Sequence, residues 1–194
     1  MKLTPTAIPD VLIIKMDVIE DERGFFTELY QVHKFAEAGI NHAFVQDNRA
    51  GSRQGVLRGM HYQIRQTQGK LVQAIVGTVY DVVIDLRHRS PTFGKWVGNY
   101  LSDKEKIQLW IPPGFAHGYY VMSEWAEIFY KATDFYAPQW ERTLLWNDPD
   151  IGIEWPLIDG HQPIVSLKDA QGKRLADAEL FDSSNNIRSP FRSP

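Results

Sequence analysis

The chain has 194 residues, enough for one domain with a sizeable core, and its apolar share of 43% and charged share of 23% are typical of globular proteins. A net charge of −3 argues against binding of nucleic acid through bulk electrostatics, and no apolar run is long enough for a membrane span. The absence of cysteine excludes disulfides, thiolate metal sites and cysteine nucleophiles. Lys15 interrupts the longest early apolar run, so we expect no signal peptide and a cytoplasmic location.

The predicted strands are short runs of β-branched and aromatic residues separated by turn residues. Aromatic residues make up 12% of the chain, which favours a β-rich protein with a ligand-lined cavity. About ten strands at this spacing indicate an all-β sandwich or jelly-roll barrel. In chain order they cover residues 11–19, 24–30, 55–63, 70–76, 78–86, 96–101, 108–111, 118–122, 127–135 and 144–146.

Turns and helices complete this outline. Gly77-Thr78 lies between two apolar runs and predicts a tight hairpin. One helix is expected over residues 31–38, ended by Gly39, and a second short one near residues 169–177. No repeat or linker divides the chain, so residues 1–182 are expected to form a single domain. Residues 183–194 carry Ser, Asn, Arg and Pro with little to bury, and we expect a loose tail there.

Several common catalytic motifs are absent. The sequence contains no P-loop, no G-x-G-x-x-G, no G-x-S-x-G and no H-E-x-x-H. Nucleotide hydrolysis, hydride transfer, serine hydrolysis and zincin chemistry are therefore disfavoured. Any chemistry must come from side chains without a recognisable cofactor cradle.

Polar side chains are densest in three segments between residues 46 and 70. On a straight strand His61 and Gln63 share a face with Leu57 and Gly59, and this face would line the polar interior of a ligand-holding barrel. Considered alone, His61 is more readily explained as an exposed or hydrogen-bonded sheet histidine. Arg58 falls on the opposite face, unless a bulge intervenes or Arg58 lies at the end of the strand.

A second candidate is a histidine that follows a rigid turn. Pro112, Pro113 and Gly114 force a turn that places His117 at the start of the next strand. His117 is then either a corner residue that hydrogen-bonds the turn or a ligand contact, and the pattern favours neither.

Other polar residues are ambiguous as well. Tyr130 shares a face with Ile128 and Ala132. Considered alone, it is more readily explained as a core aromatic residue whose hydroxyl has a hydrogen-bond partner. Asp81 and Asp85 share a face and are interpreted as structural or solvated carboxylates. The pair Lys168-Asp169 has the character of any surface pair.

Taken together, these segments resemble one family, the dTDP-4-dehydrorhamnose 3,5-epimerases of the cupin-like jelly-roll class. The likeness runs from about residue 8 to about residue 169, and its strength lies in many motifs that occur in order and at the right spacing. The matching motifs are Asp21-x-Arg23-Gly24-x-Phe26-x-Glu28, Gln46-Asp47-Asn48, Arg58-Gly59-x-His61-Tyr62-Gln63, Gln68-Gly69-Lys70-Leu71-Val72, Asp81-x-x-x-Asp85-x-Arg87, Ser90-Pro91-Thr92-Phe93-Gly94, Pro112-x-Gly114-Phe115-Ala116-His117-Gly118, Tyr130-Lys131-Ala132-Thr133, Trp146-Asn147-Asp148 and Ser166-x-Lys168-Asp169.

The resemblance implies roles for individual residues. His61 corresponds to the general base, Tyr130 to the general acid, Asp169 to the partner that orients His61, and Lys70 to the cation near the keto oxygen. Tyr136 corresponds to the ring that stacks on thymine. The other implied contacts to the nucleotide sugar are Arg23, Phe26, Glu28, Gln46, Asn48, Arg58, His117, Glu141 and Lys168.

The resemblance also implies a homodimer and an enzyme that needs no cofactor. In the family the segment with Arg23 and Glu28 reaches into the neighbouring subunit, so an N-terminal arm of about residues 1–30 is expected in the dimer contact. A metal-binding cupin needs more ligands than His61-x-Gln63 and His117 supply, so we expect no metal. The only other partner expected is a small nucleotide sugar; neither nucleic acid nor membrane is expected.

The implied reaction is epimerisation at C3 and C5 of dTDP-4-dehydro-6-deoxy-D-glucose, through an enolate, to dTDP-4-dehydro-L-rhamnose. One alternative is an epimerase of a related dTDP-4-keto-deoxysugar that inverts only one of the two carbons. Another is a jelly roll that binds sugar nucleotides without catalysis. A metal-dependent cupin oxygenase or isomerase is a further possibility of a different class.

Overall fold

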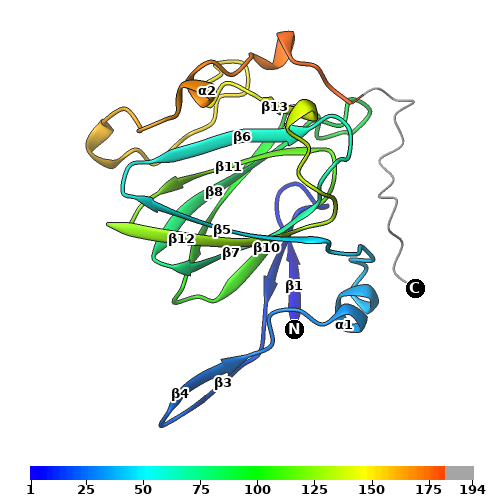
Figure 1. Cartoon of the computed structure of the whole chain (residues 1–194), viewed down its shortest axis with the longest axis vertical. Coiled ribbons are helices and arrows are strands. Elements are labelled where there is room, and N and C mark those ends of the chain that lie inside the picture. Colours follow the sequence, from blue (N-terminus) through cyan, green and yellow to red (C-terminus); the bar gives the residue numbers. More distant parts are fainter. Residues whose placement is uncertain (182–194) are drawn as a thin grey trace.

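A computed structural model describes residues 1–181, which form two antiparallel sheets packed face to face (Figure 1). The lower sheet in that view has six strands, in the spatial order β1 (Lys2–Pro5), β2 (Leu12–Lys15), β10 (Ile107–Ile111), β7 (Lys70–Val76), β12 (Trp125–Ala132) and β5 (Gln46–Arg53). The upper sheet has five, in the order β13 (Glu141–Thr143), β6 (Leu57–Gln63), β11 (Phe115–Val121), β8 (Thr78–Asp85) and β9 (Trp96–Ser102). The predicted all-β class with few short helices is confirmed.

The core lies between the two sheets. Side chains alternate along each strand, so one face of each strand points inward. Val72, Val83, Leu109 and Ile128 are fully buried in this inner layer. Because apolar side chains fill the space only in part, the remainder of the inner surface is free for polar groups.

The outer faces are covered by short elements. α1 (Val32–Glu37) begins after Gln31, whose side-chain oxygen accepts the Lys34 N–H at 2.7 Å, and buries Phe35 against the outer face of the six-stranded sheet. The region after β13 covers the other sheet and contains α2. The remaining short elements are η1 (Pro138–Trp140), η2 (Ile158–Gly160), α2 (Leu167–Ala170) and η3 (Leu175–Asp177).

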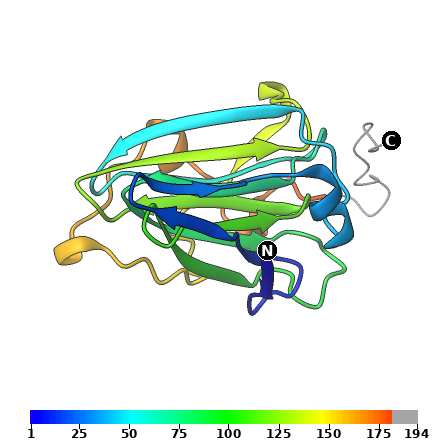
Figure 2. The ribbon, with the colours of Figure 1, turned by 90° about the horizontal axis from the view of Figure 1, so that it is seen from below.

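A two-stranded hairpin of β3 (Val18–Asp21) and β4 (Gly24–Thr27) projects as an arm beneath the six-stranded sheet (Figure 1), and seen from below its strands lie over that sheet (Figure 2). Ile19, Phe25 and Phe26 on the arm are each 60–67% exposed. Apolar side chains exposed to this degree on a projecting hairpin are typical of an interaction surface.

The strand prediction was wrong in several places. Gly77 does not form a hairpin: β7 and β8 lie in different sheets, and Gly77, with φ +71, carries the chain from one sheet to the other. The expected strand over 11–19 is divided into β2 and β3, and residues 144–146 contribute only an isolated bridge. β1, β5 and β13 were missed. β5 has no apolar alternation, because one of its faces is polar and the other is solvent-exposed.

The remaining expectations on chain organisation concern the second helix, the tail and the membrane. The second helix begins earlier than expected, at Leu167, and only a 3-10 turn occupies residues 175–177. The predicted tail over 183–194 lies outside the described residues. Within residues 1–181 no helix is long and apolar enough to cross a membrane.

Candidate active site

Two histidines stand side by side on the inner face of the five-stranded sheet. His61 on β6 and His117 on β11 are direct partners across the antiparallel strands. Side chains at directly opposed positions have Cβ atoms about 5 Å apart, so both imidazoles belong to one site. His117 therefore lines the pocket, and its contact with a ligand stays a prediction.

A bulge returns Arg58 to the face of His61. His117 pairs with His61 but Tyr119 pairs with Arg58, so two residues of β6 oppose Gly118 alone. Gly59 has φ +142, and a Cβ on Gly118 would lie 2.7 Å from the Arg58 carbonyl oxygen, so the bulge requires glycine at both places. The prediction from simple alternation, which placed Arg58 on the opposite face, was wrong. Of the two exceptions considered, a bulge or a position at the strand end, the bulge is the one that occurs.

His61 is held by a buried carboxylate. Its Nε2 lies 2.7 Å from Oδ1 of Asp169, which is only 3% exposed, and the other oxygen of Asp169 accepts the Gly59 N–H at 3.3 Å. Burial raises the pKa of Asp169, but hydrogen bonds, above all from His61, outweigh burial and keep it below its ordinary value. An ionised carboxylate only accepts, so Nε2 carries the proton and Nδ1 of His61 is the nitrogen free to take one.

α2 positions this carboxylate. The helix begins after Ser166, whose hydroxyl oxygen accepts the Asp169 N–H at 3.1 Å. This N-cap turns the Asp169 side chain toward the sheet instead of toward solvent. The interpretation of Lys168-Asp169 as a surface pair was wrong for Asp169.

The opposite wall of the pocket carries a lysine and a tyrosine from the six-stranded sheet. Lys70 on β7 is opposed by Ala132 of β12, so Tyr130, two residues earlier on β12, lies on the same inner face. Burial lowers the pKa of Lys70 to about 8, against the opposing effect of Glu141 and Asp81. Burial raises the pKa of Tyr130, and the Glu141 carboxylate adds to this effect.

The two walls enclose a cavity of about 160 Å³ lined by Arg58, His61, Lys70, His117 and Tyr130, together with Ala50, Gly118 and Tyr119. A neighbouring cavity of about 80 Å³ shares three of these residues, His61, Lys70 and Tyr130. The general base, the general acid and the cation predicted from the resemblance thus face one space.

A second group of predicted residues surrounds the mouth of the smaller cavity. Oε2 of Glu141 accepts hydrogen bonds from Lys168 at 2.6 Å and from the Tyr136 hydroxyl at 2.9 Å. Burial raises the pKa of Glu141, but Lys168 and Tyr136 outweigh it and keep the pKa below its ordinary value. Gln46 accepts the Tyr136 N–H at 2.8 Å and donates to the Asn48 side chain at 2.8 Å, which ties β5 to this group.

Three predicted contacts do not reach the pocket within one chain. Arg23 pairs with Asp21 on the arm, and Phe26 is 67% exposed there. Glu28 accepts from Lys34 at 2.7 Å, close to where the arm joins the body of the protein. These side chains can serve a site only if the arm reaches another copy.

One residue that contacts a pocket side chain was not singled out from the sequence. Asp81 is fully buried, and its Oδ2 lies 2.8 Å from Nε2 of His117. Of the two interpretations given for Asp81, a structural or a solvated carboxylate, the solvated one was therefore wrong. The signal lay in the strand sequence TVYDVVID: a carboxylate among apolar and aromatic residues that form the core needs a polar partner. Asp85 on the same strand does have a structural role, because Arg87 and two hydroxyl groups surround it.

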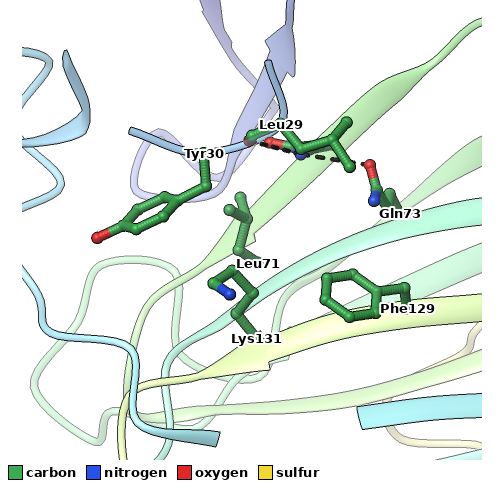
Figure 3. Close-up of a pocket in the computed structure, with 7 residues that line it drawn as sticks. Leu29, Tyr30, Leu71, Gln73, Phe129 and Lys131 are labelled. Atoms are coloured by element: carbon green, nitrogen blue, oxygen red, sulfur yellow. Dashed lines mark hydrogen bonds between the residues drawn. The ribbon is translucent and has the colours of Figure 1, made fainter. Parts of the chain in front are cut away.

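Two cavities of more than 300 Å³ lie outside this site. One of about 400 Å³ is on the outer face of the six-stranded sheet, between Leu29 and Tyr30 and the side chains of Gln73, Phe129 and Lys131 (Figure 3). The other, of about 650 Å³, continues beneath the arm. Both are lined in part by residues of the arm or of the segment that follows it, and neither is lined by His61, Lys70 or Tyr130. Among residues 1–181, no three His, Asp or Glu side chains gather as ligands of a metal ion would.

Comparison with known proteins places this arrangement among relatives. Residues 5–177 match the family model described as dTDP-4-dehydrorhamnose 3,5-epimerase. The dTDP-4-dehydrorhamnose 3,5-epimerase of Pseudomonas aeruginosa is 57% identical over 182 residues, covering 93% of this chain and 99% of the relative.

Solved structures agree with this comparison. The dTDP-6-deoxy-D-glucose-3,5-epimerase of Legionella pneumophila, in complex with dTDP-4-keto-L-rhamnose, has a TM-score of 0.89 and 49% identity, covering 92% of this chain and 94% of that one. A 3'-monoepimerase of Streptomyces bikiniensis, in complex with dTDP-quinovose, is more distant, with a TM-score of 0.82 and 31% identity over 89% of this chain and 87% of that one.

Proposed function

The chain belongs to the dTDP-4-dehydrorhamnose 3,5-epimerase family, and we infer that it is an isomerase that converts dTDP-4-dehydro-6-deoxy-D-glucose to dTDP-4-dehydro-L-rhamnose. The observation that carries this inference is the pocket in which the His61–Asp169 pair faces Tyr130, with Lys70 beside it. Inversion of a carbon next to a ketone needs a base on one side of the sugar and an acid on the other. The opposed sheets supply both.

His61 is the proposed base. Imidazole is the side chain whose ordinary titration range lies near neutral pH, so it can take a proton from carbon and lose it again to solvent. The Asp169 carboxylate on Nε2 directs Nδ1 at the substrate and stabilises the imidazolium that forms. The C–H bond at C3 or C5 breaks, the proton passes to Nδ1, and the electron pair moves onto the C4 oxygen as an enolate.

Lys70 is the proposed partner of the enolate oxygen. Acid–base groups contribute about 10²–10⁴-fold to a rate, which is too little for removal of a proton from carbon. One preorganised donor at a developing oxyanion contributes roughly 3–4 kcal/mol more in a pocket that excludes water. A partly buried ammonium group close to both His61 and Tyr130 has the place and the charge for this role.

Tyr130 is the proposed acid. Burial raises its pKa, so the phenol keeps its proton at neutral pH and can give it to the face of the sugar opposite His61. The C–H bond then forms on that face, the enolate collapses to the ketone, and the configuration is inverted. The phenolate regains its proton from solvent.

The nucleoside diphosphate needs cations and a stacking surface. Arg58 lines the larger cavity, and Lys168, paired with Glu141 of the smaller cavity, is a second cation from the same chain. Tyr136 is half-exposed beside Glu141, where its ring can stack on thymine. Gln46 and Asn48 on β5 offer amide groups to the sugar and the base.

We propose a homodimer in which the arm of each copy completes the site of the other. The support is the exposed apolar side chains of the arm, the cavities beneath it, and three predicted substrate contacts that lie too far out to serve their own chain. Gln108 on β10 donates to the Leu29 carbonyl oxygen at 2.9 Å and so anchors the base of the arm on the outer sheet face (Figure 3). Light scattering of the purified protein tests the dimer.

The proposed reaction is tested by solvent deuterium incorporation. Incubation of dTDP-4-dehydro-6-deoxy-D-glucose with the protein in D₂O should label both C3 and C5, and NMR should identify the product as dTDP-4-dehydro-L-rhamnose. Label at one carbon alone would identify a single-carbon epimerase. No label at all would favour a sugar-nucleotide-binding protein. The reaction as written requires no metal, so activity should survive dialysis against a chelator.

A further inference from the structure

The pocket contains a second imidazole–carboxylate pair. Nε2 of His117 lies 2.8 Å from Oδ2 of Asp81, just as Nε2 of His61 lies 2.7 Å from Asp169. Asp81 is two residues away from the direct cross-strand partner of His117, so the two side chains meet diagonally on the inner face. A row of Asp81, His117, His61 and Asp169 therefore crosses the wall of the site.

Asp81 is costly for the fold. Removal of a carboxylate from water is unfavourable unless partners surround it. Asp85, four residues later on the same strand, has such partners in Arg87 and two hydroxyl groups. Asp81 has His117, while its Oδ1 has no hydrogen-bond partner among the described residues. A carboxylate that served only the fold would be surrounded as Asp85 is. We therefore attribute the burial of Asp81 to its contact with the imidazole of His117.

We propose that Asp81 is a positioning residue that makes His117 a hydrogen-bond donor to the C4 oxygen of the bound sugar. The carboxylate accepts the Nε2 proton of His117, fixes the ring, and leaves Nδ1 for the substrate. A neutral ring of this tautomer would present only a lone pair at Nδ1. The negative charge of Asp81 stabilises the imidazolium, whose Nδ1–H can donate to an enolate oxygen. This proposal rests on the proposed function.

The proposed role of Asp81 predicts the same effect at both reacting carbons. The C4 ketone lies between C3 and C5, so the enolates formed toward either carbon place their charge on the same oxygen. A group that supports this oxygen must affect both epimerisations. Loss of Asp81 should therefore slow proton exchange at C3 and at C5 by similar factors, and the effect should appear in kcat rather than in KM.

The test compares Asp81→Asn, His117→Gln and the double variant by deuterium exchange at each carbon. Asp81→Asn should reduce kcat about 10²-fold at both positions, as expected for a weakened oxyanion donor, with KM and dTDP binding close to those of the parent. The double variant should be no slower than His117→Gln, because Asp81 acts through His117. Asp148→Asn is the matched control: Asp148 is also buried, but it accepts hydrogen bonds from the backbone N–H groups of Asp150 and Leu175, and none of these residues lines the pocket. This control should retain the parental kcat.

Three results would overturn the proposal: losses that multiply in the double variant, slowing at one carbon only, or a rise in KM with kcat unchanged. A second measurement needs no Asp81 variant. In the ¹⁵N NMR spectrum of the parent protein, with the His117 signals assigned by their loss in His117→Gln, both ring nitrogens should be protonated. A neutral ring would contradict the proposal even if Asp81→Asn failed to fold, and a proton on Nδ1 alone would also contradict the pairing with Asp81. Absence of exchange in the parent enzyme would instead defeat the proposed function and leave the ring measurement to decide the pairing.

Discussion

His61 and His117 are direct cross-strand partners on the inner face of one sheet, and each imidazole meets its own buried carboxylate. The carboxylates come from opposite sides, one from a helix late in the chain and one from the neighbouring strand. The facing sheet provides Lys70 and Tyr130. These six side chains come from six separate segments of the chain, so the role of each can be tested by substitution.

Substitution of Tyr130 should separate proton exchange from inversion. In Tyr130→Phe, His61 can still remove a proton and return a solvent-derived one to the same face, so deuterium should enter the substrate while net inversion falls by about 10²–10⁴-fold. NMR of the recovered sugar measures both. Tyr120→Phe is a suitable control, because Tyr120 is a buried tyrosine that packs on the outer side of the five-stranded sheet, away from the pocket. Equal losses of exchange and inversion would contradict the role of Tyr130 as acid.

The rate should depend on the protonation of Lys70. Burial lowers the pKa of Lys70 to about 8, below the ordinary value of 10.5, so the ammonium form is present below about pH 8 and is lost as the pH rises through that value. Because the cation stabilises the enolate, kcat should decline above about pH 8. Lys70→Met should be slower by about 10²–10³-fold and lack this alkaline limb, whereas Lys95→Met on the surface should keep it. If Lys70→Met kept the decline of kcat above about pH 8, the titration of another group would be its cause.

Mixing two inactive variants tests the shared site. Arg23→Ala removes a contact on the arm, and His61→Ala removes the base in the body. If each arm serves the other copy, a mixed dimer has one intact site and one doubly damaged site, so an equal mixture after exchange of subunits should recover about a quarter of the parental activity. Each variant alone should stay inactive. A mixture without recovered activity would place the arm outside the partner's site.

Much of the site could be predicted from the sequence, because its residues lie in short motifs that keep their spacing. His61, Lys70, Tyr130 and Asp169 come together as predicted. Arg58 could not be placed, because alternation along a strand assumes an unbroken register, and the bulge at Gly59 adds a residue. Sequence alone gives no register between strands.

Two further differences have physical causes. β5 was missed because its residues QDNRAGSR lack the apolar alternation by which a strand is identified, although they pair with β12 along its full length. Gly77 was taken for a hairpin because a glycine with positive φ suits a turn and a crossing between sheets equally well. Asp81 shows the same limit, since its partner His117 is distant in sequence.

The bulge itself can be tested at Gly118. A Cβ there would lie 2.7 Å from the Arg58 carbonyl oxygen and 2.9 Å from Cα of Gly59, and backbone atoms cannot rotate away. Gly118→Ala should therefore lower the free energy of unfolding by about 1–3 kcal/mol and raise KM, because Arg58 shifts from the pocket. Urea denaturation and steady-state kinetics measure the two effects. A variant as stable and as active as the parent would show that the bulge is unnecessary.

The most direct test of the mechanism is deuterium exchange by His61→Asn, followed separately at C3 and C5 and compared with His88→Asn on the surface. Proton abstraction by His61 predicts that label fails to enter at both carbons in His61→Asn, while dTDP still binds and the control exchanges like the parent. Label entering either carbon at the parental rate in His61→Asn would mean that another group removes that proton, and the proposed mechanism would be wrong.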